Sequence, residues 1–418
     1  MPMAVRKSAL FLLLLLFLLC GWAYNDVLSS GQAGLKEAER GVVHVFIFSL
    51  VVLHFLYVFP DRGPRGGTTG VLLLLTAIPL WEAAVDWLRG APLMSSLTML
   101  MMAFWWIAAY KLPGVFCRRH PADAAWFTGA CLIMFVVYVW LNLQARRQIT
   151  THLERDFAVT GYAYYLIVFV PYILLLRRSV LRTVLLCVSL AMTLTSFKRG
   201  CMVTLPVMLL VYGWVRARLT KRWSGFVLGV AAFVIVGVAA VTVVDEASGG
   251  FVSERFSREE MEDGSGRAGN FRLAWDHICQ RNFPELLFGA GHGSSVELIG
   301  TGVHNEWLEF LFSFGVVGLV LYFLLGVAFL WQCARAVRRR SAYAPHMCMM
   351  MAYFYMVSLF SGFYGVYVTY YFFVFMGLVK YLGEKEKEKR SLTADAGRET
   401  EAGPAGLAGI SNGKDGIG

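Results

Sequence analysis

A histidine stands directly in front of a long apolar run in the second half of the chain. His304 and Asn305 precede "EWLEFLFSFGVVGLVLYFLL", which has the composition of a membrane helix. An imidazole with an ordinary pKa of about 6.5 can accept a proton from a hydroxyl group, so His304 could act as a general base. The alternative is a histidine that only forms local hydrogen bonds at the start of a helix. On one continuous helix, positions 304, 308, 311, 315 and 318 would share a face. We therefore expect His304 at the top of a tightly packed seam, supported by Asn305 and by Gly315, whose missing side chain permits close helix packing.

Basic residues also occur where membrane topology alone would not place them. Six of them are expected at the outer side of the membrane: Arg146, Arg147, Lys198, Arg199, Arg267 and Arg272. Guanidinium groups match phosphate oxygens bidentately, and such contacts are stronger at a partly desolvated boundary than on a free surface. The alternative is that these long side chains only extend toward the lipid–water interface. We expect them to form a binding surface for a diphosphate.

Other polar groups give weaker signals. Glu82 and Asp86 are spaced i,i+4 in an expected span and could form a proton or ion site, although solvation at the helix end explains Asp86 equally well. The stretch Phe288–Ser295, "FGAGHGSS", lacks the Gly-Lys-Ser/Thr ending of a P-loop, so we expect a tight loop that lets the backbone approach the site. The sequence has no Asp-rich motif and no CxxC pair. A reaction without metal or cofactor is therefore expected.

The composition restricts the class of protein. Of the 418 residues, 57% are apolar and only 16% are charged, with a formal net charge of +10. These values favour an all-α, polytopic membrane protein over a soluble domain. Apolar runs near the ~20 residues that cross a bilayer recur along the chain and predict about twelve spans. The expected spans are 8–24, 42–60, 70–88, 93–111, 124–143, 161–176, 180–197, 201–215, 225–244, 305–333, 346–361 and 365–382.

The spans divide the chain into four parts. Nine of them lie in residues 1–244, residues 245–303 form one large outer loop, and residues 304–382 hold the last three. Residues 383–418 are charged and then glycine-rich, so we expect a disordered tail. Lys and Arg are more frequent in the expected inner segments than in the short outer loops. Both termini are therefore expected in the cytoplasm, and His304 on the outer side.

Four short motifs follow one another between Thr195 and Leu325. In order they are "SFKRG" at a helix end, "GRAGNFRLAWDHI" with its arginines and tryptophan, "LFGAGHGSS", and "HNEWLEFLFSFGVVG", in which a His-Asn pair is followed after nine residues by Gly315. Their order and sidedness resemble the bacterial O-antigen ligase and O-antigen polymerase superfamily. In this resemblance, Lys198 stands where a smaller residue is usual.

The resemblance implies a membrane glycosyltransferase of the GT-C type, in the bacterial inner membrane, with a periplasmic active site and no cofactor. The donor would be an undecaprenyl-diphosphate-linked glycan. His304 would be the catalytic base, and Arg199, Arg267 and Arg272 the diphosphate clamp. Both Arg267 and Arg272 remain candidates for the arginine that precedes the family's tryptophan.

Three functions remain open. A ligase would transfer the glycan to lipid A-core, and the single large outer loop after the ninth span favours this branch. A polymerase would transfer it to a second lipid-linked repeat unit. A transporter of the same lipid-linked sugars would use charges within the membrane, for which Glu82 and Asp86 are the candidates.

Overall fold

The computed structural model describes residues 69–91, 93–119, 124–153, 161–257, 267–363 and 368–401, together with Val52 and Val159. No residue in these ranges lies in a β-strand, so the predicted all-α fold is confirmed for this part of the chain. The expected spans 8–24 and 42–60 lie outside the described residues, apart from Val52. The helices are α3 (Thr69–Leu88), α4 (Leu93–Arg119), α5 (Ala124–Leu153), α6 (Tyr162–Ile167), α7 (Val170–Leu174), α8 (Ser179–Thr195), α9 (Arg199–Thr220), α10 (Trp223–Ala247), α11 (Phe251–Arg255), α13 (Arg267–Cys279), α14 (Phe283–Phe288), α15 (Ser294–Ile299), α16 (Glu306–Arg338), α17 (Ala344–Phe360) and α18 (Val368–Glu401).

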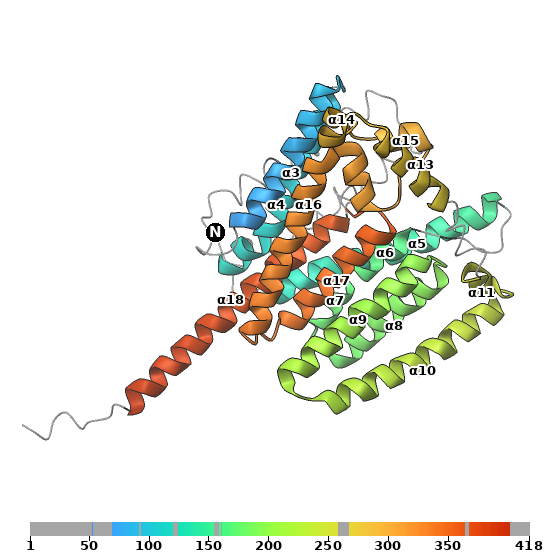
Figure 1. Cartoon of the computed structure of the whole chain (residues 1–418). Coiled ribbons are helices and arrows are strands. Elements are labelled where there is room, and N and C mark those ends of the chain that lie inside the picture. Colours follow the sequence, from blue (N-terminus) through green and yellow to red (C-terminus); the bar gives the residue numbers. More distant parts are fainter. Residues whose placement is uncertain are drawn as a thin grey trace, which may run out of the picture.

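Several described helices have the length and composition of membrane spans. Five qualify: α3, the Phe127–Arg147 part of α5, α9, α10 and α16, while three further apolar segments are shorter. In α10, no residue is buried although nearly all its side chains are apolar, and Figure 1 shows it at the edge of the bundle. Such a surface is unfavourable in water but suits contact with lipid tails. The chain is therefore a multi-pass membrane protein, and the number of twelve spans stays a prediction.

One expected span is broken. Residues 161–176 form the two short helices α6 and α7 instead of one, with Pro171 near the start of α7. Because proline has no backbone N–H, it cannot continue the hydrogen-bond ladder of a preceding helix. The Phe169 N–H instead donates to the carbonyl of Leu166, which tightens the turn between the two helices.

Two apolar clusters hold the described part together. The larger one joins helices from α3 to α18, with α9 packed along α17 and α18 along α4. The smaller one consists of Ala274, Ile278, Val303 and Phe312 and attaches α13, α14 and α15 to the start of α16. Figure 1 shows these three short helices gathered over one end of the bundle. The smaller cluster therefore fixes the segment that leads into His304.

α16 is not one straight helix. Gly315 has φ 65° and ψ −169°, a combination that essentially only glycine adopts. The ring centroids of Phe310 and Tyr322 lie 4.4 Å apart with the rings nearly parallel, whereas a straight helix would separate these positions by about 18 Å. Residues 306–314 are therefore a short arm that folds back along a long arm of residues 316–338, and Figure 1 shows both arms beside α14. The expected continuous helix over residues 305–333, and with it the single face through His304 and Gly315, is wrong, although α16 still qualifies as a membrane span.

The hydrogen bonds at this turn give the physical reason. The N–H groups of Ala290 and Gly291 donate to the carbonyls of Phe312 and Ser313, at 3.3 and 2.8 Å. These carbonyls would otherwise bond within a continuing helix. The glycine-rich stretch does bring backbone close to backbone, as expected, but at the α16 turn.

The expected disordered tail is also corrected. α18 continues as a helix to Glu401, and only residues 402–418 of the tail lie outside the described part. Glu and Lys are good helix formers, and oppositely charged pairs at i,i+3 and i,i+4 support a helix. Two such pairs are present, Lys385–Glu388 at 2.7 Å and Glu386–Arg390 at 2.5 Å. A high content of charged residues was therefore not a sufficient reason to predict disorder in residues 383–401.

Candidate functional site

His304 lies in a loop between α15 and α16. Its φ of 59° is left-handed, which is uncommon for a residue other than glycine. Asn305 follows as the N-cap of α16, and its Oδ1 accepts a hydrogen bond from the Leu308 N–H at 3.0 Å. The His304 side chain is exposed, with Nε2 3.4 Å from the hydroxyl of Thr301. The N-cap therefore ends the loop so that the imidazole stays accessible.

The end of α17 holds the neighbouring groups. Arg267 donates from Nη1 to the carbonyl of Phe360 at 2.9 Å, and Asn305 donates from Nδ2 to the carbonyl of Leu359 at 3.2 Å. The last carbonyls of a helix lack partners within the helix, and cations near them also complement its dipole. α13 and α16 are thus both fastened to the same helix end. Arg267 and His304 are brought together by this arrangement.

Lys198 and Arg199 lie at the turn from α8 to α9. Phe197 has a left-handed φ of 52°, Lys198 is the N-cap of α9, and Arg199 is its first residue. Gly200 is required here because a Cβ would overlap with the hydroxyl of Tyr164. The "SFKRG" motif therefore builds a sharp turn that presents two cations beside the first free amides of a helix.

The electrostatics favour a neutral imidazole. Partial desolvation by the neighbouring protein lowers the pKa of the His304 side chain, the positive charges of Arg267 and Lys198 lower it further, and Glu309 partly opposes them. Burial also lowers the pKa of Lys198, with a further contribution from Arg267. The accessible His304 side chain thus lies next to protein surface that disfavours an added positive charge. Above the lowered pKa, the imidazole can accept a proton.

The other expected site residues are placed differently. Arg199 donates from Nη1 to the carbonyl of Arg255 at 2.9 Å, so part of its fork ties α9 to α11. Arg272 is exposed on α13, and Arg147 is exposed on α5, where Arg146 is half-buried. The charges that shift the pKa of His304 include neither of the two α5 arginines nor Arg272. The structure therefore brings Lys198, Arg267, His304 and Asn305 together.

Gly315 has a role that differs from the expected one. A Cβ on Gly315 would overlap with the carbonyl of Leu287, and a Cβ on Gly289 would overlap with the backbone of Ser313. The two glycines therefore allow the "FGAG" loop and the α16 turn to cross in direct backbone contact. Gly315 supports the site by folding the short arm back, not by forming a seam below His304.

Two carboxylates near the site were missed by sequence reasoning. Glu309 accepts hydrogen bonds from the Ser295 and Ser313 hydroxyls, at 2.7 and 2.9 Å, and from the Val303 N–H, at 3.1 Å. Glu306 is buried and accepts from the Phe363 N–H at 2.8 Å. Glu309 therefore fixes the residue before His304. The available signal was two acidic residues at the start of an otherwise apolar helix.

A small cavity adjoins Lys198. Its volume is about 80 Å³, and its lining includes Tyr164, Tyr165, Tyr353 and Ser361. Tyr353 also donates to the carbonyl of Tyr164 at 3.1 Å. The lining therefore combines a cation with phenolic and backbone groups, next to the helix end that Arg267 occupies.

Comparison with known families supports the motif order. Residues 183–323 match the family described as O-antigen ligase. This part of the chain belongs to the O-antigen ligase superfamily. The matched residues of the O-antigen ligase domain include both cations of the α8–α9 turn, Arg267, Arg272, His304 and Gly315, but not the two α5 arginines. Members of the superfamily are membrane glycosyltransferase-like enzymes, both ligases and polymerases. No curated protein matches the chain.

Proposed function

We propose that this O-antigen ligase superfamily member is a ligase that transfers an undecaprenyl-diphosphate-linked glycan to lipid A-core. The reaction takes place at the periplasmic face of the bacterial inner membrane and needs no metal or nucleotide. The single observation that carries the proposal is the solvent-exposed His304 side chain beside Arg267 and Lys198, where partial desolvation by the neighbouring protein and these two charges lower its pKa. A neutral imidazole beside two cations suits proton transfer next to a departing anion.

In the proposed reaction, an acceptor hydroxyl oxygen attacks the anomeric carbon of the donor sugar, and the hydroxyl proton passes to the imidazole of His304. The bond from the anomeric carbon to the diphosphate oxygen breaks, and its electron pair leaves with the diphosphate. Attack from the opposite face inverts the anomeric centre. Lys198 and Arg267 stabilise the negative charge that develops on the leaving group.

The remaining cations take outer roles in this proposal. Arg199 ties α9 to α11 through its bond to the carbonyl of Arg255, and its guanidinium would contact the diphosphate from there. Arg272, Arg146 and Arg147 would contact the diphosphate or the glycan further from the anomeric carbon. Asn305 positions His304 through its cap and its bond to Leu359.

A polymerase would use the same chemistry with a different acceptor. What favours the ligase is the long segment between α10 and α16, whose described residues include the helices α11, α13, α14 and α15. A transporter is favoured less, because Asp86 accepts a hydrogen bond from the His292 N–H at 2.7 Å and so anchors the glycine-rich loop. That contact gives Asp86 a structural task without ion transport.

The test is a reaction of the purified chain with undecaprenyl-diphosphate glycan and lipid A-core, without metal or nucleotide. Glycan on lipid A-core supports the ligase. Longer glycans that remain on undecaprenyl diphosphate would show that the protein is a polymerase and not a ligase. If the donor crossed a vesicle membrane with its linkage unchanged, the protein would be a transporter, and both enzyme functions would be rejected.

A further inference from the structure

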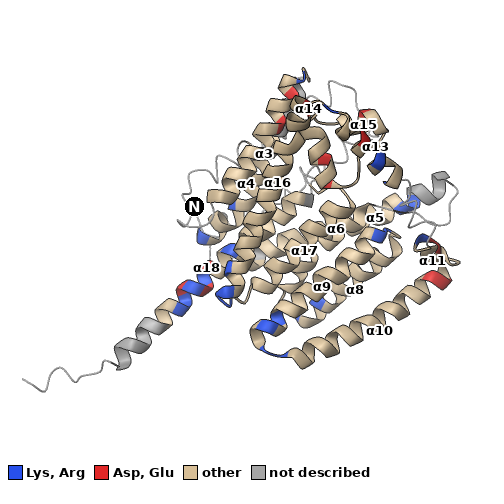
Figure 2. Cartoon of the chain, viewed as in Figure 1, with Lys and Arg blue, Asp and Glu red and all other residues tan. Residues whose placement is uncertain are grey.

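A second polar site lies at the other end of the long arm of α16. A cavity of about 280 Å³ opens between the last turns of α16, the start of α17 and the middle of α18. Asn305, next to His304, bonds to the end of α17, whereas the cavity is lined by Met347 near the start of the same helix. The 17 residues of α17 rise by about 24 Å. The cavity is therefore at the opposite end of the helix bundle from His304, and Figure 2 shows Lys and Arg gathered where α16 meets α18.

The cavity is rich in cations. Its lining contains five basic side chains and two carboxylates: Arg335, Arg339, Lys380, Lys387, Arg390, Glu384 and Glu386. Apolar wall is contributed by Ala336, Met347 and Val379. The lining of the cavity thus combines positively charged side chains with an apolar wall.

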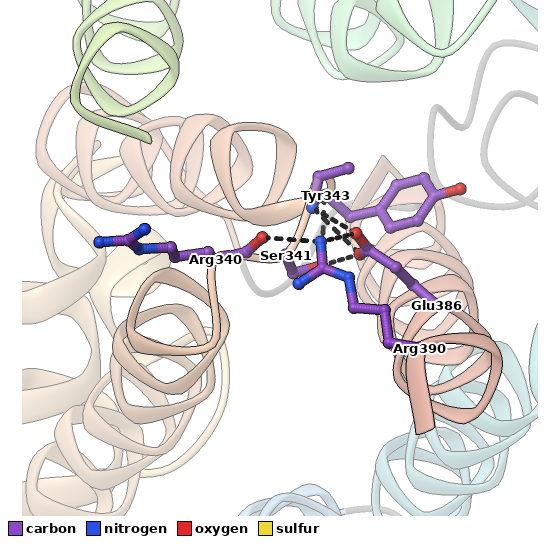
Figure 3. Close-up of polar contacts among 6 residues, drawn as sticks. Arg340, Ser341, Tyr343, Glu386 and Arg390 are labelled. Carbon is purple, nitrogen blue, oxygen red and sulfur yellow. Dashed lines mark hydrogen bonds and ion pairs between the residues drawn. The ribbon is translucent and has the colours of Figure 1, made fainter. Parts of the chain in front are cut away.

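Both carboxylates are already used by the protein. Glu386 accepts from the Ser341 hydroxyl at 2.8 Å, from the Ala342 N–H at 3.0 Å and from Arg390 at 2.5 Å. Arg390 also donates to the carbonyl of Arg340 at 3.3 Å, and Figure 3 shows this network. It fastens α18 to the turn between α16 and α17 and so builds one wall of the cavity.

Glu384 is the other carboxylate, and it lies 3.9 Å from the ammonium group of Lys380. Three lining cations remain. Arg335, Arg339 and Lys387 have no side-chain hydrogen bond and no ion pair with another residue in the described ranges. Three positive groups around one cavity repel one another, so an anion between them would relieve that repulsion.

We propose that this cavity binds a phosphate-bearing anion, held by Arg335, Arg339 and Lys387. Guanidinium forks bind phosphate oxygens bidentately. A basic pocket between membrane helices at their inner end is a suitable place for an anionic lipid headgroup. The apolar wall gives an acyl chain a path, and the cavity of about 280 Å³ has room for a phosphate group. A soluble phosphate or diphosphate shares the same chemistry and is the other source.

Such a ligand would connect α16 to α18, since Lys387 lies on α18 and the two arginines on α16. It would therefore hold the charged half of α18 against the bundle. This inference uses none of the residues assigned to glycosyl transfer and does not depend on the proposed function.

The test uses the full chain in nanodiscs of phosphatidylcholine, with or without one-quarter phosphatidylglycerol, measured by native mass spectrometry and by thermal unfolding. The double variant R335Q/R339Q is compared with R338Q, which removes a charge from the same helix end outside the cavity. Arg338 lies over the ring of Trp331, 5.3 Å from its centroid. K387Q is a third variant, on the exposed face of α18, where folding is not at risk.

The wild type and R338Q should retain phosphatidylglycerol and have a higher Tm in nanodiscs that contain it than in pure phosphatidylcholine. The affinity for phosphatidylglycerol should fall roughly tenfold or more in R335Q/R339Q and by less in K387Q. Inorganic pyrophosphate that raises the Tm in pure phosphatidylcholine, dependent on the same residues, would support the site with a soluble ligand. Equal lipid retention in wild type, R335Q/R339Q and K387Q would overturn the proposal. An equal loss in R338Q would also overturn it, because it would indicate general surface charge.

Discussion

Nη1 of Arg267 lies 2.9 Å from the carbonyl oxygen of Phe360. This bond joins the first residue of α13 to the last residue of α17, helices that are far apart along the chain. Asn305 bonds to the preceding carbonyl, so His304 and Arg267 are positioned by the same helix end. The relation is electrostatic as well as spatial, because Arg267 contributes to the lowered pKa of His304.

The first prediction concerns the pH dependence of transfer. A base with a lowered pKa is neutral above that pKa and becomes inactive as the pH falls through it. In R267Q one positive charge near His304 is lost, so its pKa rises toward the ordinary value of about 6.5. The acid limb of the kcat/KM profile should therefore move to higher pH in R267Q. R267K keeps the charge and should keep the acid limb of the wild type.

The control for this experiment is R272Q, which removes an exposed arginine from the same helix. Its acid limb should match the wild type. If R272Q moved the limb as far as R267Q does, the assignment of Arg267 as the neighbour of His304 would be wrong.

The second prediction tests His304 as the base. Asparagine tolerates the left-handed φ that His304 adopts and cannot accept the proton, so H304N preserves the loop while removing the chemistry. Transfer should fall by roughly 10²–10⁴-fold, while the Tm and donor binding stay near the wild-type values. Wild-type turnover in H304N would show that His304 is not the general base.

The third prediction concerns Glu309, which fixes Val303 beside His304. In E309Q the side-chain oxygen can still accept from that N–H, but the negative charge that raises the pKa of His304 is gone. The acid limb should therefore move to lower pH, opposite to R267Q, with turnover on the plateau changed less than tenfold. E309A loses every accepted bond and should lower the Tm as well as turnover. An unmoved acid limb in E309Q would show that Glu309 does not act electrostatically on His304.

Sequence reasoning predicted the all-α class of fold, and among the residues that it named for a site are Lys198, Arg267, His304 and Asn305, which the folded chain brings together. The α8–α9 turn and the His-Asn pair are local features, since capping and tight turns depend on a few adjacent residues. The α16 turn depends on Gly289 and Gly315, which are distant in sequence and meet only in the folded chain. From the sequence alone, glycines within one apolar run are equally compatible with a closely packed helix face and with a turn that reverses the direction of the chain. The helix of α18 was missed because charge content was weighed without the spacing of its ion pairs.

The last prediction tests the α16 turn. In G315A the new Cβ would overlap with the carbonyl of Leu287, and alanine strongly disfavours the φ and ψ of this position. Strain of roughly 1–3 kcal/mol from the dihedrals alone, together with the overlap, should lower the yield of folded protein and its Tm. G289A should behave alike, because the two glycines face one another across the same crossing. G129A on α5 is the matched control, since nothing lies within 4 Å of its added Cβ, and it should keep the wild-type Tm. A G315A variant as stable as G129A would mean that residues 306–338 can form one continuous helix, and the short arm that carries His304 would then have to be placed anew.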